Sequence, residues 1–246
     1  LCESCVDDNW LKYLNWLIVS YNMMLDRLSD AFEVQRHFTA NAARVLRTPL
    51  ALMQVQLDLY NSTRHPGNDA DTLHTIRMVT EQNVRLSKMV KTLLDMSELQ
   101  TVGRDEKIIV DALVDEVLAD LEPLAQEKSI KLIGKCKAAT MVGSDILIYR
   151  LVYNLVENAI KYNHLGGQVT VTAYQKEKQV YLSVADTGSG IPEELRERVF
   201  EPFFRVDKSR SRELGGVGLG LALVREIVRV HDGSITVKSN PSGGTI

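Results

Sequence analysis

An apolar repeat with the spacing of a coiled coil occupies the first part of the chain. Between Trp10 and Val45 the repeat positions alternate by four and three residues: Trp10, Leu14, Leu17, Tyr21, Met24, Leu28, Ala31, Gln35, Phe38, Ala42 and Val45. Only Gln35 breaks the apolar character of this seam. A repeat of this kind, sustained over several heptads, predicts a continuous helix that pairs in parallel with a second copy of itself.

A second helix is predicted downstream, and the two helices form a hairpin. Turn residues in Thr63–Asp69 predict a loop, and Pro49 is expected to kink the first helix because it removes a backbone hydrogen bond. Between Asp71 and Leu99 the apolar residues fall on one helical face: Leu73, Ile76, Val79, Leu86, Val90 and Leu93. A lone hairpin cannot bury such a face, whereas two hairpins form a four-helix bundle. We therefore expect a homodimer.

The composition changes after Gly103, where strands and helices mix. Short strands are expected at residues 107–110, 130–133, 168–174, 180–185 and 234–239, and helices at residues 146–162 and 219–230. This mixture predicts an α+β sandwich with its helices on one face of a sheet. The expected fold class is thus a helical hairpin that dimerises into a four-helix bundle, followed by an α+β sandwich domain.

Size, charge and cysteine content restrict the class of protein. A length of 246 residues suits about two domains, or one domain and a long helical segment. The net charge of −3 gives no reason to expect nucleic acid or an anionic membrane as a partner. Three cysteines cannot all pair, which suits a reducing compartment. Cys2 and Cys5 have C-x-x-C spacing, but no second pair follows, which disfavours a zinc site.

The most apolar segment does not have the pattern of a membrane span. Residues 10–28 carry polar or charged side chains at Lys12, Asn15, Ser20, Asn22, Asp26 and Arg27. No uninterrupted apolar stretch reaches the roughly 18 residues that a spanning helix needs. The segment is therefore predicted to be a helix with one apolar face.

Residues 154–162 place amide and cationic groups close together on a predicted helix. Asn154, Asn158, Lys161 and Tyr162 stand at i, i+4, i+7 and i+8. The amide oxygen of Asn158 is a hard ligand suited to Mg²⁺, and the ammonium of Lys161 can neutralise a phosphate. Taken alone, two asparagines at this spacing are more often a solvated helix face.

Three further segments carry groups that suit a nucleotide. Asp186 directly follows a predicted strand, where its carboxylate can accept the adenine amino hydrogen while Gly188 and Gly190 let the backbone approach the base. Residues 200–205 end in Arg205, which is available to phosphates. The glycines of residues 215–221 open a predicted helix and form an anion cradle: Gly216, Gly218 and Gly220. Taken separately, each segment is a weak signal, because it could equally be a plain turn, a set of core aromatics or a glycine run.

Together, the four segments resemble the ATP-binding boxes of sensor histidine kinases and of the wider Bergerat-fold, or GHKL, ATPases. They occur in the family's order and with family-like spacing, which makes the set far more specific than any single motif. The resemblance implies ATP and Mg²⁺ as cofactors, with Asn158 as the metal ligand, Tyr162 near the nucleotide and residues 200–205 as the hinge of a lid. The family continues beyond Gly243-Gly244-Thr245 into a further strand.

Residues 38–50 resemble the phospho-acceptor segment of the same kinases. The family's acceptor histidine corresponds here to Arg44, its acidic neighbour to Val45, and its threonine to Thr48. Phosphoryl transfer needs a neutral imidazole nitrogen and benefits from an adjacent carboxylate. A guanidinium stays protonated and has no lone pair to offer, so Arg44 is expected to be a solvated helix residue and not a catalyst. The replacement is compatible with both a natural and an engineered origin.

The resemblance also predicts how the chain is divided. Residues 1–38 correspond to part of a HAMP-type signalling helix, with Tyr21–Leu28 most similar to its second helix. Residues 39–102 correspond to the dimerisation and phospho-acceptor hairpin, and residues 103–246 to the ATP-binding domain. It further implies a response-regulator receiver domain as a partner and a parent protein anchored by an upstream transmembrane sensor, with this part on the cytoplasmic side of the membrane.

Four functions agree with these features. The first is a histidine kinase whose autophosphorylation and transfer to a regulator aspartate are lost through Arg44 and Val45. The second is a phosphatase of the phosphorylated regulator, in which the Thr48 hydroxyl orients a water molecule. The third is a non-catalytic signalling pseudokinase that binds ATP. The fourth, a Bergerat-fold ATPase unrelated to signalling, leaves the helical hairpin unexplained.

Overall fold

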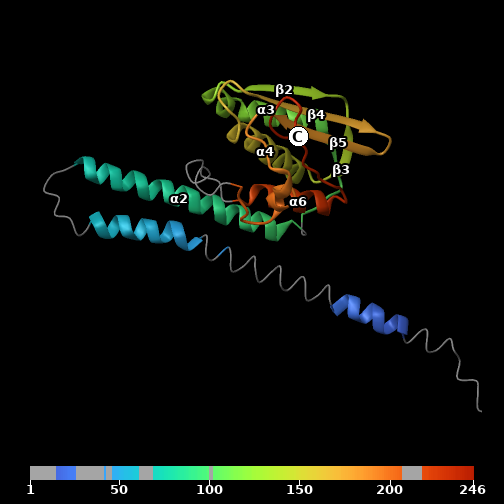
Figure 1. Cartoon of the computed structure of the whole chain (residues 1–246), viewed down its shortest axis with the longest axis horizontal. Coiled ribbons are helices and arrows are strands. Elements are labelled where there is room, and N and C mark those ends of the chain that lie inside the picture. Colours follow the sequence, from blue (N-terminus) through green and yellow to red (C-terminus); the bar gives the residue numbers. More distant parts are fainter. Residues whose placement is uncertain (1–14, 26–41, 43–45, 61–68, 100–101, 207–217) are drawn as a thin grey trace, which may run out of the picture. The chain divides into compact units, whose positions relative to one another are not determined.

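The computed structural model describes residues 15–25, 42, 46–60, 69–99, 102–206 and 218–246 (Figure 1). The chain divides into two compact units, residues 1–51 and 52–246. In the first unit, residues 15–25 and 46–51 are helical, as the heptad pattern predicts. Leu17, Tyr21 and Met24 of the seam are exposed by 61%, 60% and 66%, so this apolar face is uncovered in a single copy.

Several predicted features of the helical region fall outside the described residues. These are seven of the seam positions and most of the turn: Trp10, Leu14, Leu28, Ala31, Gln35, Phe38, Val45 and residues 63–68. The second unit begins with a helix over residues 52–60, which is followed by α2 (Asp69–Glu98). The Tyr60 hydroxyl lies 3.0 Å from Thr72 Oγ1, which links this helix to α2. The predicted second helix is therefore confirmed, to within two residues of its expected start.

The α/β part of the second unit follows α2. Its elements are β1 (Glu106–Ile109), α3 (Val110–Glu127), β2 (Lys131–Cys136), β3 (Thr140–Gly143), α4 (Asp145–Lys161), β4 (Gln168–Lys176), β5 (Gln179–Asp186), the 3₁₀ turns Glu193–Leu195 and Arg198–Phe200, and α6 (Gly220–Val230). One sheet has the order β2-β4-β5, in which β2 and β4 are parallel and β4 and β5 antiparallel. A second sheet pairs β1 with β3. The predicted sequence of a helical region and then an α/β domain is confirmed.

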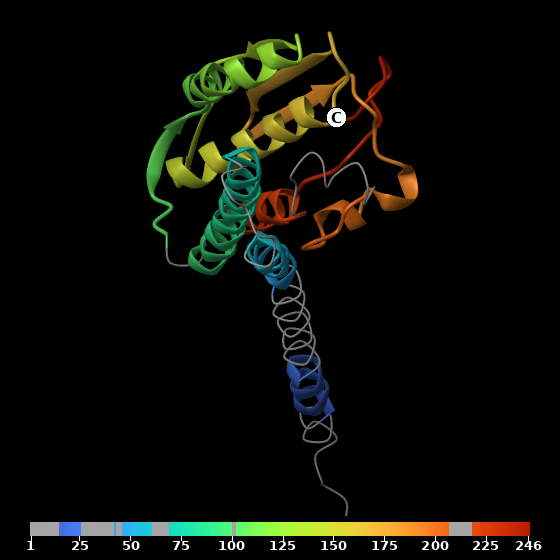
Figure 2. The same ribbon diagram turned by 90° about the vertical axis from the view of Figure 1, so that its left-hand side faces the viewer.

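The core lies between the larger sheet and its helices. β4 is an inner strand, and its residues Val169, Val171 and Ala173 alternate along one face and are completely buried. α3 and α4 lie on the same face of the β2-β4-β5 sheet (Figures 1 and 2). α4 contacts both α3 and α6, so it is the central helix of this layer. One face of α4 packs tightly in the core, where Val152, Val156 and Ile160 are completely buried.

The structure differs from the predicted elements in two respects. α3 and β3 were not expected, and Val110, expected to end a strand, instead begins α3. The predicted strand Ser234–Ser239 is wrong, because within the described residues only Ser239 forms a bridge, to Thr245. Lys238 and Ile246 exchange two 2.8 Å backbone hydrogen bonds next to this bridge. A strand needs hydrogen bonds to a neighbouring backbone, and residues 234–237 have no such partner among the described residues.

Candidate functional site

α4 brings the first set of predicted site residues to one surface. Asn154 and Asn158 are one helical turn apart and half-buried, on a face adjacent to the buried stripe. The Asn154 side-chain N–H donates to the Arg150 carbonyl over 2.7 Å, so its amide oxygen is not used in this hydrogen bond. Lys161 closes the helix, and burial lowers the pKa of its ammonium. α4 thus presents two amides and a partly desolvated cation from one rigid element.

The glycine segment meets α4 at the start of α6. A Cβ built on Gly220 would lie 2.9 Å from Asn154 Oδ1 and 3.7 Å from Asn158 Nδ2. A larger residue would therefore crowd the Asn154 amide and contact the Asn158 amide. The N-terminus of α6, with its outward-directed N–H groups, lies beside the predicted metal ligand, which is an arrangement suited to an anion.

The segment after β5 packs on the other end of α4. Tyr162 ends the helix, and its carbonyl accepts a 3.3 Å hydrogen bond from the Ser189 N–H. A Cβ on Gly188 would overlap the same Tyr162 carbonyl, so only glycine fits at that position. Gly190 has a φ of +72°, a conformation that glycine adopts without strain. Burial raises the pKa of the Tyr162 phenol.

Asp186 is held in a partly buried polar frame at the end of β5. Its Oδ1 accepts from the Gly188 N–H over 2.8 Å and from the Thr245 N–H over 3.3 Å. Its backbone N–H donates to the Thr245 carbonyl, and its carbonyl accepts from the Asn240 side-chain amide. Burial raises the pKa of the Asp186 carboxyl, and the two N–H donors partly oppose this effect. These contacts fix the orientation of the carboxylate.

The lid segment is joined to the glycine segment by the backbone. The Phe203 N–H donates to the Gly218 carbonyl over 2.7 Å. Gly218 has a φ of +78°, and a Cβ there would lie 2.6 Å from the Phe204 carbonyl oxygen. The third and fourth predicted boxes are therefore in direct contact. The rest of the lid, residues 207–217, lies outside the described residues, and this includes Gly216.

A cavity of about 1710 Å³ unites most of the predicted site. Nine of the predicted residues line it: Asn154, Asn158, Lys161, Tyr162, Asp186, Gly190, Arg205, Gly218 and Gly220. Gly188 lies next to them, packed behind Tyr162. Arg44 and Val45 lie outside the described residues, and Thr48 is an exposed helical residue of the first unit. The predicted nucleotide residues are thus brought together around one large cavity.

Sequence reasoning did not identify several polar residues in or beside this cavity, among them the following four. Lys88 and Thr92 of α2 contribute to its wall. Thr245 and Asn240 complete the frame of Asp186. The turn residues that follow Asn240, Pro241 to Gly244, could have indicated a chain reversal toward β5. Nothing in the pattern of α2 singles out Lys88, because lysines are common on exposed helix faces.

The chemistry of the cavity fits a Mg²⁺-bound nucleotide. Among the described residues, no group of three or more His, Cys, Asp or Glu side chains could hold a metal ion. Mg²⁺ commonly binds through one or two protein oxygens together with substrate phosphates, so a single amide oxygen from Asn158 is sufficient as a protein ligand. The close approaches at Gly188 and Gly220 bring the segment after β5 and the start of α6 directly against α4, where the cationic and amide groups lie.

Two family descriptions match the chain. Residues 34–102 match the "His Kinase A (phospho-acceptor) domain", and residues 143–246 match the "Histidine kinase-, DNA gyrase B-, and HSP90-like ATPase". The described helices include none that is long and apolar enough to cross a membrane.

Known proteins with similar sequences and structures are sensor kinases. The sensor histidine kinase RppB of Synechocystis is 36% identical over 224 residues, which cover 88% of this chain and 49% of RppB. The structure of the mycobacterial sensor histidine kinase MprB is similar with a TM-score of 0.50 and 30% identity, over 56% of this chain and 89% of that one. Histidine kinase ThkA, solved in complex with the response regulator TrrA, has the same fold, with a TM-score of 0.69 and 23% identity over 91% of this chain and 63% of ThkA. The chain spans about half the length of the curated relatives it matches.

Proposed function

The chain belongs to the sensor histidine kinase family, and from this premise we propose that it is the dimerising and ATP-binding portion of a two-component sensor kinase that does not phosphorylate itself at the usual position. Residues 1–38 are the signalling helix, residues 39–102 the dimerisation hairpin and residues 103–246 the nucleotide-binding domain. The parent protein is anchored in the membrane, with this portion on its cytoplasmic side and a response-regulator receiver domain as its partner.

The observation that carries nucleotide binding is the convergence of four separate segments on one cavity. Asn158 and Lys161 come from α4, Asp186 from the end of β5 and Gly220 from the start of α6. The Asp186 carboxylate accepts a hydrogen bond from the adenine amino group, for which two backbone N–H donors already orient it. Asn158 binds Mg²⁺, while Lys161, Arg205 and the α6 N-terminus neutralise the phosphates. ATP, when bound, supplies the phosphoryl group that the parent reaction transfers to histidine.

The loss of autophosphorylation follows from the residues at the acceptor position. Neither Arg44 nor Val45 can accept a proton or attack phosphorus. His37 lies seven residues before Arg44, so a continuous helix would place it within about 20° of the same face but about 10 Å away along the axis. Phosphoryl transfer needs near contact, and an error of about 1 Å can cost a hundredfold in rate. His37 therefore does not replace the missing acceptor.

Phosphatase activity toward the phosphorylated regulator is the second candidate function. It is favoured by Thr48, which keeps the family's threonine position and is exposed on its helix. Its hydroxyl can orient a hydrolytic water, but the histidine and acid that accompany it in the family are replaced. We expect this activity to be weak.

Incubation with γ-labelled ATP tests the main proposal. The unmodified chain should acquire no acid-labile, base-stable label, and the double variant Arg44→His with Val45→Glu should acquire it. Calorimetric titration of both proteins should show binding of Mg-ATP. Label on the unmodified chain that disappears in His37→Gln would contradict the proposal, as would a flat titration of folded protein.

A further inference from the structure

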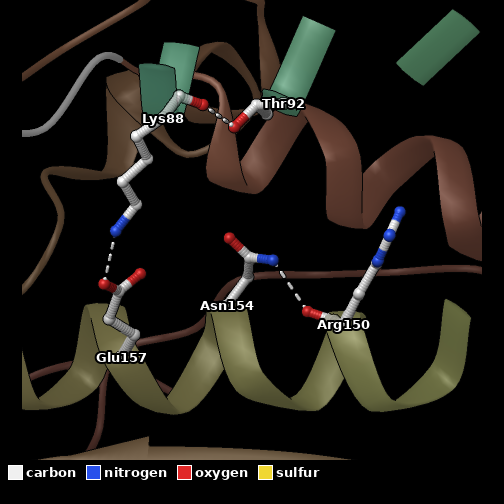
Figure 3. A network of polar contacts seen from close by, with 5 residues as sticks. All are labelled: Lys88, Thr92, Arg150, Asn154 and Glu157. Atoms are coloured by element: carbon white, nitrogen blue, oxygen red, sulfur yellow. Dashed lines mark hydrogen bonds and ion pairs between the residues drawn. The ribbon is translucent and has the colours of Figure 1, made fainter. Parts of the chain in front are cut away.

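A lysine of the helical region reaches the wall of the nucleotide cavity. The Lys88 ammonium of α2 lies 2.8 Å from the Glu157 carboxylate of α4, the residue directly before Asn158 (Figure 3). Thr92, one turn further along α2, also lines the cavity, and its hydroxyl donates to the Lys88 carbonyl over 2.9 Å. Lys88 is thus directed toward α4, although its side chain is still 63% exposed.

A second ion pair links the same two helices and fixes their register. Arg150 of α4 lies 2.7 Å from Asp95 of α2, and both side chains are more buried than Lys88. The paired positions are seven residues apart on each helix, and their order is reversed, so α2 and α4 run in opposite directions. In chain order both helices carry a cation and then an acid, so in the antiparallel pair each cation faces an acid. This arrangement favours one register over a shift that would bring like charges together.

The end of the cavity near Lys161 has an excess of positive charge. Burial is the main cause of the lowered pKa of Lys161, and the cations Lys88, Arg205 and Lys128 lower it further. Among the described residues, the carboxylate of Glu157 opposes this effect and raises the pKa of Lys161. Lys88 and Arg205 both line the cavity with Lys161. A partly buried lysine with further cations close by is an electrostatic environment that suits a polyanion.

We propose that Lys88 is a further nucleotide-binding residue, supplied by the helical region, that contacts the phosphates of the nucleotide held by α4, and that Asp95 positions it through Arg150. The proposal rests on the proposed function. Without a nucleotide, Lys88 pairs with Glu157. The phosphates of a bound nucleotide would offer the Lys88 ammonium a second anionic partner beside Glu157.

The test is a set of calorimetric titrations on the full 246-residue chain with Mg-ATP, Mg-ADP and adenosine. Lys88→Met should weaken Mg-ATP binding about 3- to 10-fold, the range for a partly exposed charge-assisted contact, and leave adenosine binding unchanged. Methionine preserves the helix propensity of lysine, so α2 should remain folded. Lys91→Met is the matched control, because this variant removes the same charge from an exposed position of α2 that does not line the cavity.

Asp95→Asn tests the positioning role from outside the cavity. It should weaken Mg-ATP binding by a smaller factor than Lys88→Met, again without an effect on adenosine. The exchange Asp95→Arg with Arg150→Asp restores an ion pair and should recover the affinity. Unchanged or tighter Mg-ATP binding by Lys88→Met would overturn the inference about Lys88 and leave the proposed function standing. If the folded, unmodified chain binds none of the three ligands, the proposed function and this inference both fail.

Discussion

Burial of the Asp186 carboxyl carries a cost to stability that its proposed role in nucleotide binding would explain. Its carboxyl has a raised pKa, mainly through burial, so the folded state holds this proton more tightly than the unfolded state. The free energy of unfolding therefore falls as the pH rises from the unfolded pKa to above the folded one, and near pH 7 the cost of burying the charge is fully present. In the proposed function, this cost is balanced by a role of the carboxylate as acceptor of the adenine amino hydrogen.

Substitution of Asp186 by asparagine should separate these two effects. The amide oxygen still accepts from Gly188 and Thr245, while the buried charge disappears. We expect the unfolding midpoint of the nucleotide-free protein at pH 7 to be unchanged or higher. Binding of Mg-ATP should weaken at least about tenfold, because a charge-assisted hydrogen bond is lost. Calorimetric titration and thermal unfolding measure the two quantities, and a lower midpoint with intact binding would contradict the assignment.

Tyr149 is a second residue with a raised pKa, and here the main cause is one neighbour rather than burial. Its hydroxyl donates to Asp120 Oδ2 over 2.5 Å, between α4 and α3, and this hydrogen bond is the main cause that raises its pKa to about 12. The folded pKa lies above the unfolded one, so the stabilisation is present below about pH 10 and is lost as the pH rises through about 12.

An ultraviolet titration of tyrosinate should detect this residue. One of the eight tyrosines should ionise late, near pH 12, and this late step should be missing in Tyr149→Phe. Asp120→Asn keeps an acceptor but removes the negative charge, so the late step should move to lower pH. An unchanged late step in both variants would assign it to another tyrosine.

At the level of elements, the junction between the lid and α6 depends on a left-handed glycine. Gly218→Ala should destabilise the domain in two ways, through the positive φ and through the contact with the Phe204 carbonyl. The left-handed conformation alone costs about 1–2 kcal/mol. Gly243→Ala is the matched control, since Gly243 also has a positive φ, +91°, but no atom within 4 Å of a built Cβ. Urea unfolding should show the larger loss of stability for Gly218→Ala.

The elements also show which parts of the fold were predictable. Long or strongly patterned segments such as α2, α4 and β4 were found, because periodicity reports a buried face directly. α3 was missed because its start, Val110, continues the apolar run of β1, and the chain passes from strand to helix without a turn residue. Local composition could not show that Ser234–Ser239 has a partner only at its end, since pairing depends on a distant segment.

The same limit applies to the candidate site. The four boxes could be identified from residue types and spacing, because each needs a particular backbone or amide at a fixed offset. Lys88 and Thr245 could not, since they reach the site only through the packing of α2 and the C-terminal segment. A residue that enters a site from another element leaves no local pattern.

At the scale of the whole molecule, the uncovered seam predicts self-association. Leu17, Tyr21 and Met24 lie on one stripe of the helix over residues 15–25 and are more than half exposed in a single copy. Apolar residues of α2 are exposed as well, among them Leu73, Ile76 and Val84. Burying each such side chain stabilises an assembly by about 1.5–3 kcal/mol before the entropic cost of association, so a second copy is the natural cover for both faces.

Sedimentation of the chain at micromolar concentration should therefore show a dimer. Met24→Asp places two carboxylates together in the seam of a parallel pair, where neither has a cation to compensate it, and should shift the equilibrium toward the monomer. Arg27→Asp, at a polar position close by in the sequence and outside the repeat, makes a larger change in charge and should leave the dimer intact. If Met24→Asp weakens the dimer more than Arg27→Asp does, the cause is pairing along the seam and not general electrostatic repulsion. A monomer for the unmodified chain would contradict the four-helix bundle.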